Sequence, residues 1–166
     1  QKNIGPAGLT IVILREDLIG KAGRDVPALL DYEANVNAGS MYNTPPTFSV
    51  YIAGLVFEWL IDKGGLASIS RENQKKANHI YSFLDKSGFY KTLVETKNRS
   101  KMNVTFRLVN DSLEDTFFRE AKNDGLVQLK GHRSVGGMRA SIYNAMPLEG
   151  VTALVNFMSD FERRHG

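Results

Sequence analysis

Residues 9–14 of this chain (LTIVIL) form an unbroken run of apolar and β-branched side chains, bounded by Gly8 and by the charged residues 15–17. Such a run predicts a β-strand that is buried on both faces. Burial on both faces suggests a sheet that is covered by helices. The run therefore favours a fold in which helices and strands pack together.

The rest of the chain alternates between segments whose apolar residues have the spacing of a helix and segments whose apolar residues have the spacing of a strand. Residues 21–46 are broken by glycine and proline and predict a long functional loop, with at most a short helix at 26–32. Thr47 is expected to cap the helix that follows. In the second predicted helix the charged run 71–76 is expected to face solvent. The predicted helices cover residues 47–63, 66 or 70 to 86, 112–125 and 148–162, and the predicted strands cover residues 90–94, 103–109 and 126–129. This order predicts an α/β chain, in the form of an α+β sandwich.

Composition excludes several classes of function. The chain of 166 residues has no cysteine, which excludes thiolate zinc sites, iron–sulfur clusters and cysteine nucleophiles and fits a reducing, cytoplasmic location. His79 and His165 have no partners at ligand spacing, so no metal site is expected. The longest apolar stretch, 50–61, is too short to span a membrane, and no signal peptide opens the chain. The net charge of +3 is dispersed, so nucleic acid is not an expected partner.

A glycine-rich polar segment, residues 130–141, carries the strongest chemical signal. It places His132, Arg133 and Arg139 among three glycines, so that backbone amides and two guanidinium groups could converge on anions. A small ligand with two anionic groups fits this set. The alternative that composition leaves open is a surface loop with solvated cations.

Two further sites are candidates. Lys2 precedes the apolar run on a loop and could act as a nucleophilic amine, although an isolated lysine is more often simply exposed. Asn43 and Thr44 lie just ahead of the helix predicted to begin at Thr47, where free amides commonly bind phosphate. Helix capping is the alternative there, and it explains Thr47 better than it explains Asn43 and Thr44.

Four motifs resemble one family of enzymes from end to end of the chain. They are residues 1–8 (QKNIGPAG), 40–47 (SMYNTPPT), 99–104 (RSKMNV) and 131–147 (GHRSVGGMRASIYNAMP). The chain resembles the phosphoserine aminotransferases, which are homodimeric, pyridoxal-phosphate-dependent enzymes of fold type I. The resemblance implies exchange of an amino group between glutamate and 3-phosphohydroxypyruvate in serine biosynthesis, and in many bacteria also a role in pyridoxine biosynthesis.

The resemblance also implies roles for individual residues. Lys2 matches the catalytic lysine that forms the Schiff base with the cofactor, and Gln1 matches a neighbour that contacts the cofactor phosphate. Asn43 and Thr44 match a pair that reaches the cofactor phosphate of the other subunit.

The substrate-binding residues lie in the glycine-rich segment. His132 and Arg133 match residues that bind the substrate phosphate from the partner subunit. Arg139 matches the arginine that holds the substrate α-carboxylate.

Family members are about twice as long as this chain. The resemblance implies that residues 1–63 are the end of the large cofactor-binding domain with a crossing loop and linker helix, and that 64–166 are the small domain. The stacking ring and the aspartate that contact the cofactor would precede Gln1, so this segment alone is expected to be inactive. Two alternatives stay open: another fold type I aminotransferase or desulfurase relative, and a non-catalytic dimerisation fragment.

Overall fold

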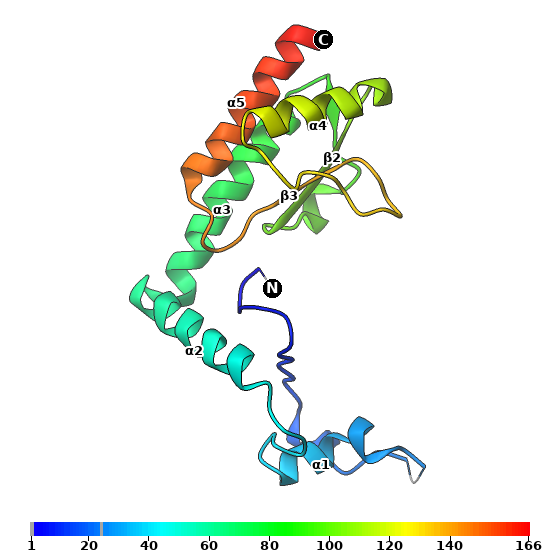
Figure 1. Cartoon of the computed structure of the whole chain (residues 1–166), viewed down its shortest axis with the longest axis vertical. Coiled ribbons are helices and arrows are strands. Elements are labelled where there is room, and N and C mark those ends of the chain that lie inside the picture. The colour runs from blue at the N-terminus through cyan, green and yellow to red at the C-terminus, as the bar shows by residue number, and fades with distance from the viewer. Residues whose placement is uncertain (1, 24) are drawn as a thin grey trace. The chain divides into compact units, whose positions relative to one another are not determined.

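The computed structural model describes residues 2–23 and 25–166, and Figure 1 labels its helices and strands. The described chain forms two compact units, residues 3–59 and residues 60–166 together with Lys2. None of the described helices has both the length and the hydropathy that crossing a membrane requires.

The first unit contains short helices joined by loops. Two 3₁₀ turns, Glu16–Leu18 and Ala28–Leu30, precede helix α1, Tyr32–Asn37, and helix α2, Thr47–Asp62, begins in this unit. The Asp31 carboxylate caps α1 by accepting a hydrogen bond from the Glu33 N–H at 3.0 Å. The short helix expected at 26–32 is present as the 3₁₀ turn Ala28–Leu30, and α1 follows where Asp31 provides the cap.

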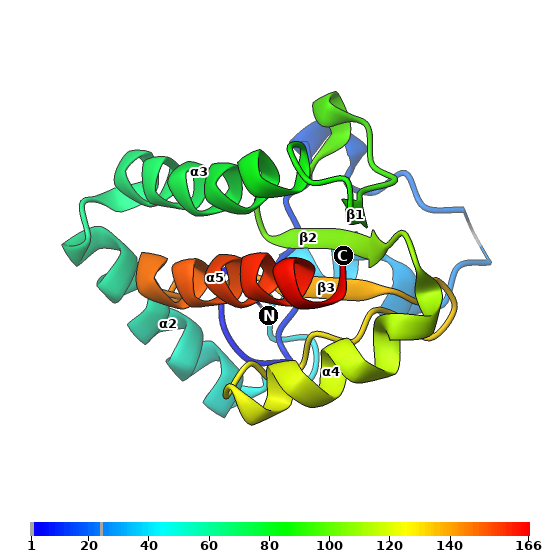
Figure 2. The ribbon, with the colours of Figure 1, turned by 90° about the horizontal axis from the view of Figure 1, so that it is seen from above.

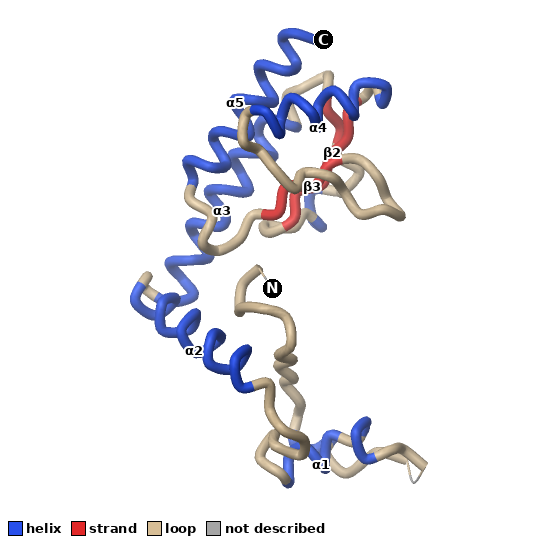
Figure 3. The backbone as a smooth tube through the Cα atoms, in the orientation of Figure 1, coloured by secondary structure: helices blue, strands red, loops and turns tan. Residues whose placement is uncertain are grey.

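The apolar run at 9–14 is not a strand, so the prediction of a buried strand is wrong. Figure 3 draws this segment as loop, and the Ile13 side chain is 97% exposed. A β-strand needs a neighbour for its backbone hydrogen bonds. Among the described residues no strand pairs with this segment, and intrinsic β propensity alone does not create a sheet.

Helix α2 begins at the expected residue but not by the expected cap. The Thr47 hydroxyl donates to the Pro45 carbonyl at 3.3 Å, whereas a capping hydroxyl accepts from a helix N–H. Thr47 is the first helical residue, and the Val50 N–H already bonds to the Pro46 carbonyl at 3.0 Å. The prediction that Thr47 caps this helix is therefore wrong.

The second unit is built on an antiparallel sheet in the order β1, β2, β3. Strand β1 is Tyr90–Lys91, β2 is Asn103–Leu108 and β3 is Met138–Ser141. Along β2 the side chains of Val104, Phe106 and Leu108 are buried and alternate with partly exposed polar ones, as the period of two predicts. The two predicted strands at 90–94 and 103–109 are thus confirmed as antiparallel neighbours, although β1 is shorter than expected.

The third strand was not where the sequence placed it. The strand predicted at 126–129 is absent, and β3 lies inside the glycine-rich segment instead. The Arg139 N–H donates to the Leu129 carbonyl at 2.7 Å, so residue 129 runs beside β3 without forming a regular strand. Gln128 adopts a φ of 62°, which interrupts an extended backbone at this point.

Three helices cover one face of this sheet. They are α3, Gly65–Leu84, α4, Glu114–Asn123, and α5, Leu148–His165, with 3₁₀ turns at Thr96–Asn98 and Asp111–Leu113. Figure 2 shows α5 in front of β3, with α3 and α4 on either side of it, and the buried side chains of all three helices join those of the sheet in one core. Within residues 60–166 the sheet and these helices therefore form an open-faced sandwich.

Helix α3 carries the expected apolar stripe and one unexpected pair of polar residues. Ala77, Ile80 and Tyr81 are buried against the sheet, as their spacing predicts. Within the charged run at 71–76, however, Asn73 and Lys76 are also buried. The expectation that this whole run faces solvent is wrong at these two positions.

The ion pair between Asp85 and Arg99 leads to a prediction about stability. The Arg99 guanidinium binds the Asp85 carboxylate through two hydrogen bonds, at 2.7 and 2.6 Å, and lies 4.6 Å from the centre of the Tyr81 ring. These hydrogen bonds hold the pKa of Asp85 below its usual value. The pair is therefore fully present above the ordinary carboxyl pKa, and its contribution is lost as the pH falls through the lowered one.

We expect Asp85→Asn to lower the free energy of unfolding by about 0.5–1 kcal/mol at neutral pH, because the pair is partly exposed. The difference from wild type should disappear in strong acid, as measured by urea unfolding across the pH range. Asp17→Asn, which breaks the well-exposed pair with Arg15, is the matched control and should have a smaller effect. A pH-independent difference for Asp85→Asn would contradict this account.

Candidate functional site

Lys2 is partly buried and belongs to the second unit. Its backbone carbonyl accepts a hydrogen bond from the Asn144 N–H at 3.3 Å. Its Nζ lies 6.0 Å from the centre of the Tyr143 ring. The backbone of Lys2 is thus tied to the loop after β3, and its amine lies beside an aromatic ring.

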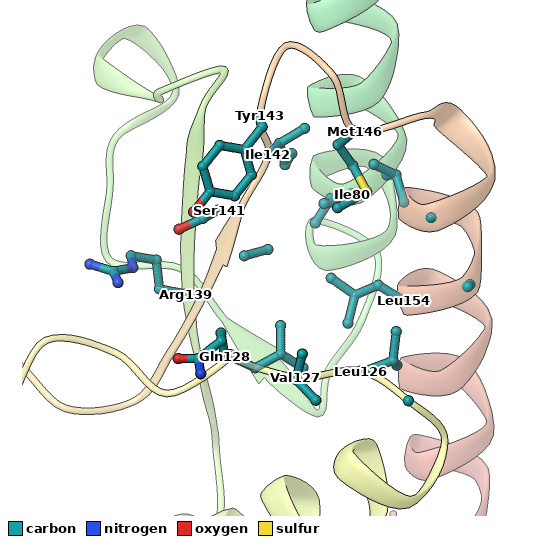
Figure 4. Close-up of a pocket in the computed structure, with 16 residues that line it drawn as sticks. Ile80, Leu126, Val127, Gln128, Arg139, Ser141, Ile142, Tyr143, Met146 and Leu154 are labelled. Carbon is teal, nitrogen blue, oxygen red and sulfur yellow. The ribbon is translucent and has the colours of Figure 1, made fainter. Parts of the chain in front are cut away.

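Arg139 lies at the centre of β3, opposite Thr105 on β2. It borders a cavity of about 600 Å³ that is also lined by Tyr143, Met146 and Leu154. Figure 4 shows the Arg139 side chain extending away from Leu154 and from the other apolar groups that line this cavity. Arg139 Nε is buried and has no hydrogen-bond partner among residues 2–23 and 25–166, which leaves a donor for an anionic ligand.

His132 and Arg133 lie on a tight turn just before β3. The turn is closed by bonds from the Val135 and Gly136 N–H groups to the His132 carbonyl, at 2.9 and 2.8 Å. The Arg107 guanidinium holds it from outside by donating to the Val135 carbonyl. Both His132 and Arg133 are exposed at the tip of this turn, where they are accessible to a ligand.

The tautomer of His132 follows from its neighbours. The Ser134 N–H donates to His132 Nδ1 at 3.3 Å, and the Ser134 hydroxyl lies 2.7 Å from the same atom. Since Nδ1 accepts a hydrogen bond, the neutral ring carries its proton on Nε2. Nε2 is therefore the ring atom that can donate to an anion.

Asn43 and Thr44 belong to the first unit, in an exposed loop ahead of α2. They are therefore not part of the set that the second unit gathers. Their side chains and the first amides of α2 are nonetheless donors suited to a phosphate group. Gln1 lies outside the described residues.

The second unit thus carries an amine, an imidazole N–H donor and two guanidinium groups on or next to the loops that flank β3. Groups of these kinds suit a small molecule with two anionic ends and a reactive carbonyl or amino group. Lys2 offers an amine that suits the aldehyde of pyridoxal phosphate, and in the first unit Asn43 and Thr44 separately offer donors that suit a phosphate group.

One neighbour of the amine carries no signal in the sequence for a role at the site. Tyr143 lies within the motif at 131–147, but only the structure shows its ring beside Lys2 Nζ. No spacing rule links residues 2 and 143, so this contact could not be found from the sequence.

The chain is similar to a known protein family. The profile of the family described as aminotransferase class-V matches residues 1–154. A phosphoserine aminotransferase from Chromobacterium violaceum is 58% identical over 167 aligned residues, which cover 100% of this chain and 46% of that protein. The chain therefore spans about half the length of this curated relative.

Solved structures show the same likeness. A phosphoserine aminotransferase from Bacillus circulans subsp. alkalophilus is 48% identical, with a TM-score of 0.93 over 99% of this chain and 46% of its own. The phosphoserine aminotransferase of Trichomonas vaginalis, solved with pyridoxal phosphate bound, is 38% identical, with a TM-score of 0.77 over 82% of this chain and 39% of its own. The fold of the chain is thus that of fold type I enzymes.

Proposed function

From the membership of this chain in the class-V aminotransferase family, whose members depend on pyridoxal phosphate, we propose that it is part of a phosphoserine aminotransferase. The complete protein would interconvert O-phospho-L-serine and 2-oxoglutarate with 3-phosphohydroxypyruvate and L-glutamate. We propose further that it acts in serine biosynthesis as a cytoplasmic homodimer.

One observation carries this proposal. The identity of 58% to the Chromobacterium violaceum enzyme extends over the whole of this chain and includes the segment with His132, Arg133 and Arg139. These cations are also the residues that the local chemistry selects for a doubly anionic substrate. The family and the local chemistry therefore favour the same class of substrate.

In this proposal Lys2 would hold the cofactor through Nζ. When bound, pyridoxal phosphate acts as an electron sink for the bond that breaks at the substrate Cα. The free Lys2 amine would take the proton from the substrate Cα as general base and would deliver it to the cofactor as general acid. Asn43 and Thr44 of one subunit, with Gln1, would hold the cofactor phosphate.

The substrate is held at both ends. Arg139 binds the α-carboxylate through its planar fork, which fixes the orientation of the Cα–H bond. His132, through Nε2–H, and Arg133 bind the substrate phosphate, and they accept the γ-carboxylate of glutamate in the other half-reaction. Because the turn that carries them is exposed, we propose that it serves the site of the partner subunit.

Gly131 provides a test of this turn. A Cβ at Gly131 would overlap the carbonyl oxygen of Gly136, so the Gly131→Ala variant must reshape the turn that carries His132 and Arg133. We expect the KM for phosphoserine to rise about tenfold, because a displacement of about 1 Å is costly in a preorganised site. Steady-state kinetics of the full-length variant would measure this rise.

Gly88→Ala is the matched control, since a Cβ there meets no atom within 4 Å. It should keep the wild-type KM. A Gly131→Ala enzyme with an unchanged KM would remove the turn from the substrate site.

The proposed function is tested with the full-length protein and added pyridoxal phosphate. We expect a yellow holoenzyme that borohydride reduces at Lys2, and an exchange of amino groups between phosphoserine and 2-oxoglutarate. A preference for alanine with glyoxylate, or release of sulfur from cysteine, would support another fold type I enzyme instead. A protein that stays colourless and binds no cofactor would support the non-catalytic alternative.

Two finer points belong to the same proposal. Activity toward the phosphorylated intermediates of pyridoxine biosynthesis would extend the substrate range without any new residue. Residues 1–166 expressed alone should be inactive, because the resemblance places the stacking ring and the aspartate that contact the cofactor before Gln1.

A further inference from the structure

Lys76, on helix α3, is a buried cation outside the set of residues proposed to bind substrate or cofactor. Its exposed fraction is 3%. Its Nζ donates to the carbonyl oxygens of Tyr143 at 2.9 Å, Asn144 at 3.2 Å and Met146 at 3.0 Å. An ammonium group has three N–H donors, and here each has one carbonyl acceptor. The lysine is thus fully satisfied by the backbone of one short loop.

Burying the Lys76 ammonium group costs free energy. Burial lowers the pKa of Lys76, since removing an ammonium group from water disfavours its charged form. An apolar side chain could fill the same space without that cost. A cation, unlike an apolar side chain, attracts three carbonyl oxygens of residues 143–146 to one point.

The loop that Lys76 holds is the one that contacts Lys2. In a trans peptide the C=O and N–H bonds point in opposite directions. The peptide that joins Tyr143 to Asn144 therefore presents its oxygen to Lys76 Nζ and its N–H to the Lys2 carbonyl, which lies 3.3 Å away. A cation on the oxygen also polarises the peptide and strengthens the N–H as a donor. A single peptide unit thus connects the two lysines.

A second bond holds the same loop from the same helix. The buried Asn73 amide donates to the Asn144 Oδ1 at 2.8 Å. Both the side chain and the backbone of Asn144 are therefore fixed by α3. The loop also contributes the Tyr143 ring that lies beside Lys2 Nζ.

We propose that Lys76 is a positioning residue for the catalytic amine: its ammonium orients the peptide between Tyr143 and Asn144, and that peptide fixes the backbone of Lys2. Lys76 acts through the loop and contacts neither substrate nor cofactor. This inference rests on the proposed function, in which Lys2 supplies the reactive amine.

Amide hydrogen exchange of the full-length protein tests the first step and needs no cofactor. In Lys76→Met the ammonium is lost while most of the apolar volume stays. We expect the N–H groups of Asn144 and Met146, which bond to Lys2 and Tyr143, to exchange at least about tenfold faster. The matched control is Lys75→Met, since Lys75 is 63% exposed and pairs with Glu72 at the surface. Its exchange should equal that of wild type.

Steady-state kinetics of the holoenzyme test the second step. Lys76 does not contact the residues proposed to bind substrate, so KM for phosphoserine should stay within about twofold of wild type, whereas kcat should fall roughly tenfold as Lys2 Nζ is displaced. A residue that merely stabilised the fold would change neither constant per folded active site. Lys75→Met should keep both constants.

The outcomes are separable. If wild type binds no pyridoxal phosphate and transfers no amino group, the proposed function fails, whatever the exchange data show. If wild type is active and folded Lys76→Met has wild-type exchange and kcat, the positioning role fails. Should Lys76→Met not fold, Lys76→Gln, which has a neutral amide with two N–H donors, takes its place with the same expectations. Loss of folding in both variants would make Lys76 a residue of the fold alone and would overturn the proposal.

Discussion

Lys2→Ala in the full-length enzyme is expected to reduce the rate of transamination at least about a thousandfold, because one amine both holds the cofactor and moves the proton. The protein should also lose the attachment that borohydride traps at this position. The fold should be unaffected, since Lys2 is held through its backbone carbonyl and its side chain is only partly buried. Single-turnover kinetics and the mass of the reduced peptide would measure both effects.

Lys2→Arg is the informative companion variant. It keeps a positive charge beside Tyr143 but has no nucleophilic amine. We therefore expect it to be as inactive as Lys2→Ala. If either variant kept its rate within tenfold of wild type, the assignment of Lys2 as the catalytic amine would be refuted.

Arg139→Ala is expected to lower kcat/KM roughly 30- to 4,000-fold. This corresponds to a loss of about 2–5 kcal/mol of transition-state stabilisation, because a charge-assisted pair is removed. Both half-reactions should suffer, because phosphoserine and glutamate both carry an α-carboxylate. The position of Arg139 within β3 fixes its backbone, and its buried Nε has no hydrogen-bond partner among the described residues.

Two further variants serve as comparisons for Arg139→Ala. Arg139→Lys keeps the charge and loses the fork, so it should recover only part of the activity. Arg119→Ala removes an exposed arginine from α4 and should leave kcat/KM unchanged. An Arg139→Ala enzyme with wild-type kcat/KM in both directions would exclude Arg139 as the carboxylate clamp.

The helices were predictable because their signal is local. Helix α3 carries apolar residues at Ala77, Ile80, Tyr81 and Leu84, and that stripe is buried as its period requires. The strands were harder, because a strand is defined by its partner. Residues 9–14 have higher β propensity than β3, yet β3 pairs with β2 and residues 9–14 pair with no described strand. Sequence pattern measures propensity and does not measure pairing.

The candidate site likewise contains residues that the sequence could identify and one that it could not. His132, Arg133 and Arg139 could be selected from residue type and glycine context alone, and their roles came from the family resemblance. Lys76 could not be found in this way, since a lysine inside a charged helical run normally faces solvent. Its burial follows from three carbonyl groups almost seventy positions away in the chain.

The unpaired run at 9–14 bears on the solubility of the chain. Six consecutive residues of high β propensity and no net charge, with Ile13 almost wholly exposed, form a template to which another chain can add by backbone pairing. Any nicked or incompletely folded form that exposes this segment is therefore prone to aggregate. The tendency to aggregate comes from these six residues. Solubility of such forms would be improved by a single charge at Ile13, far along the chain from the glycine-rich turn and β3.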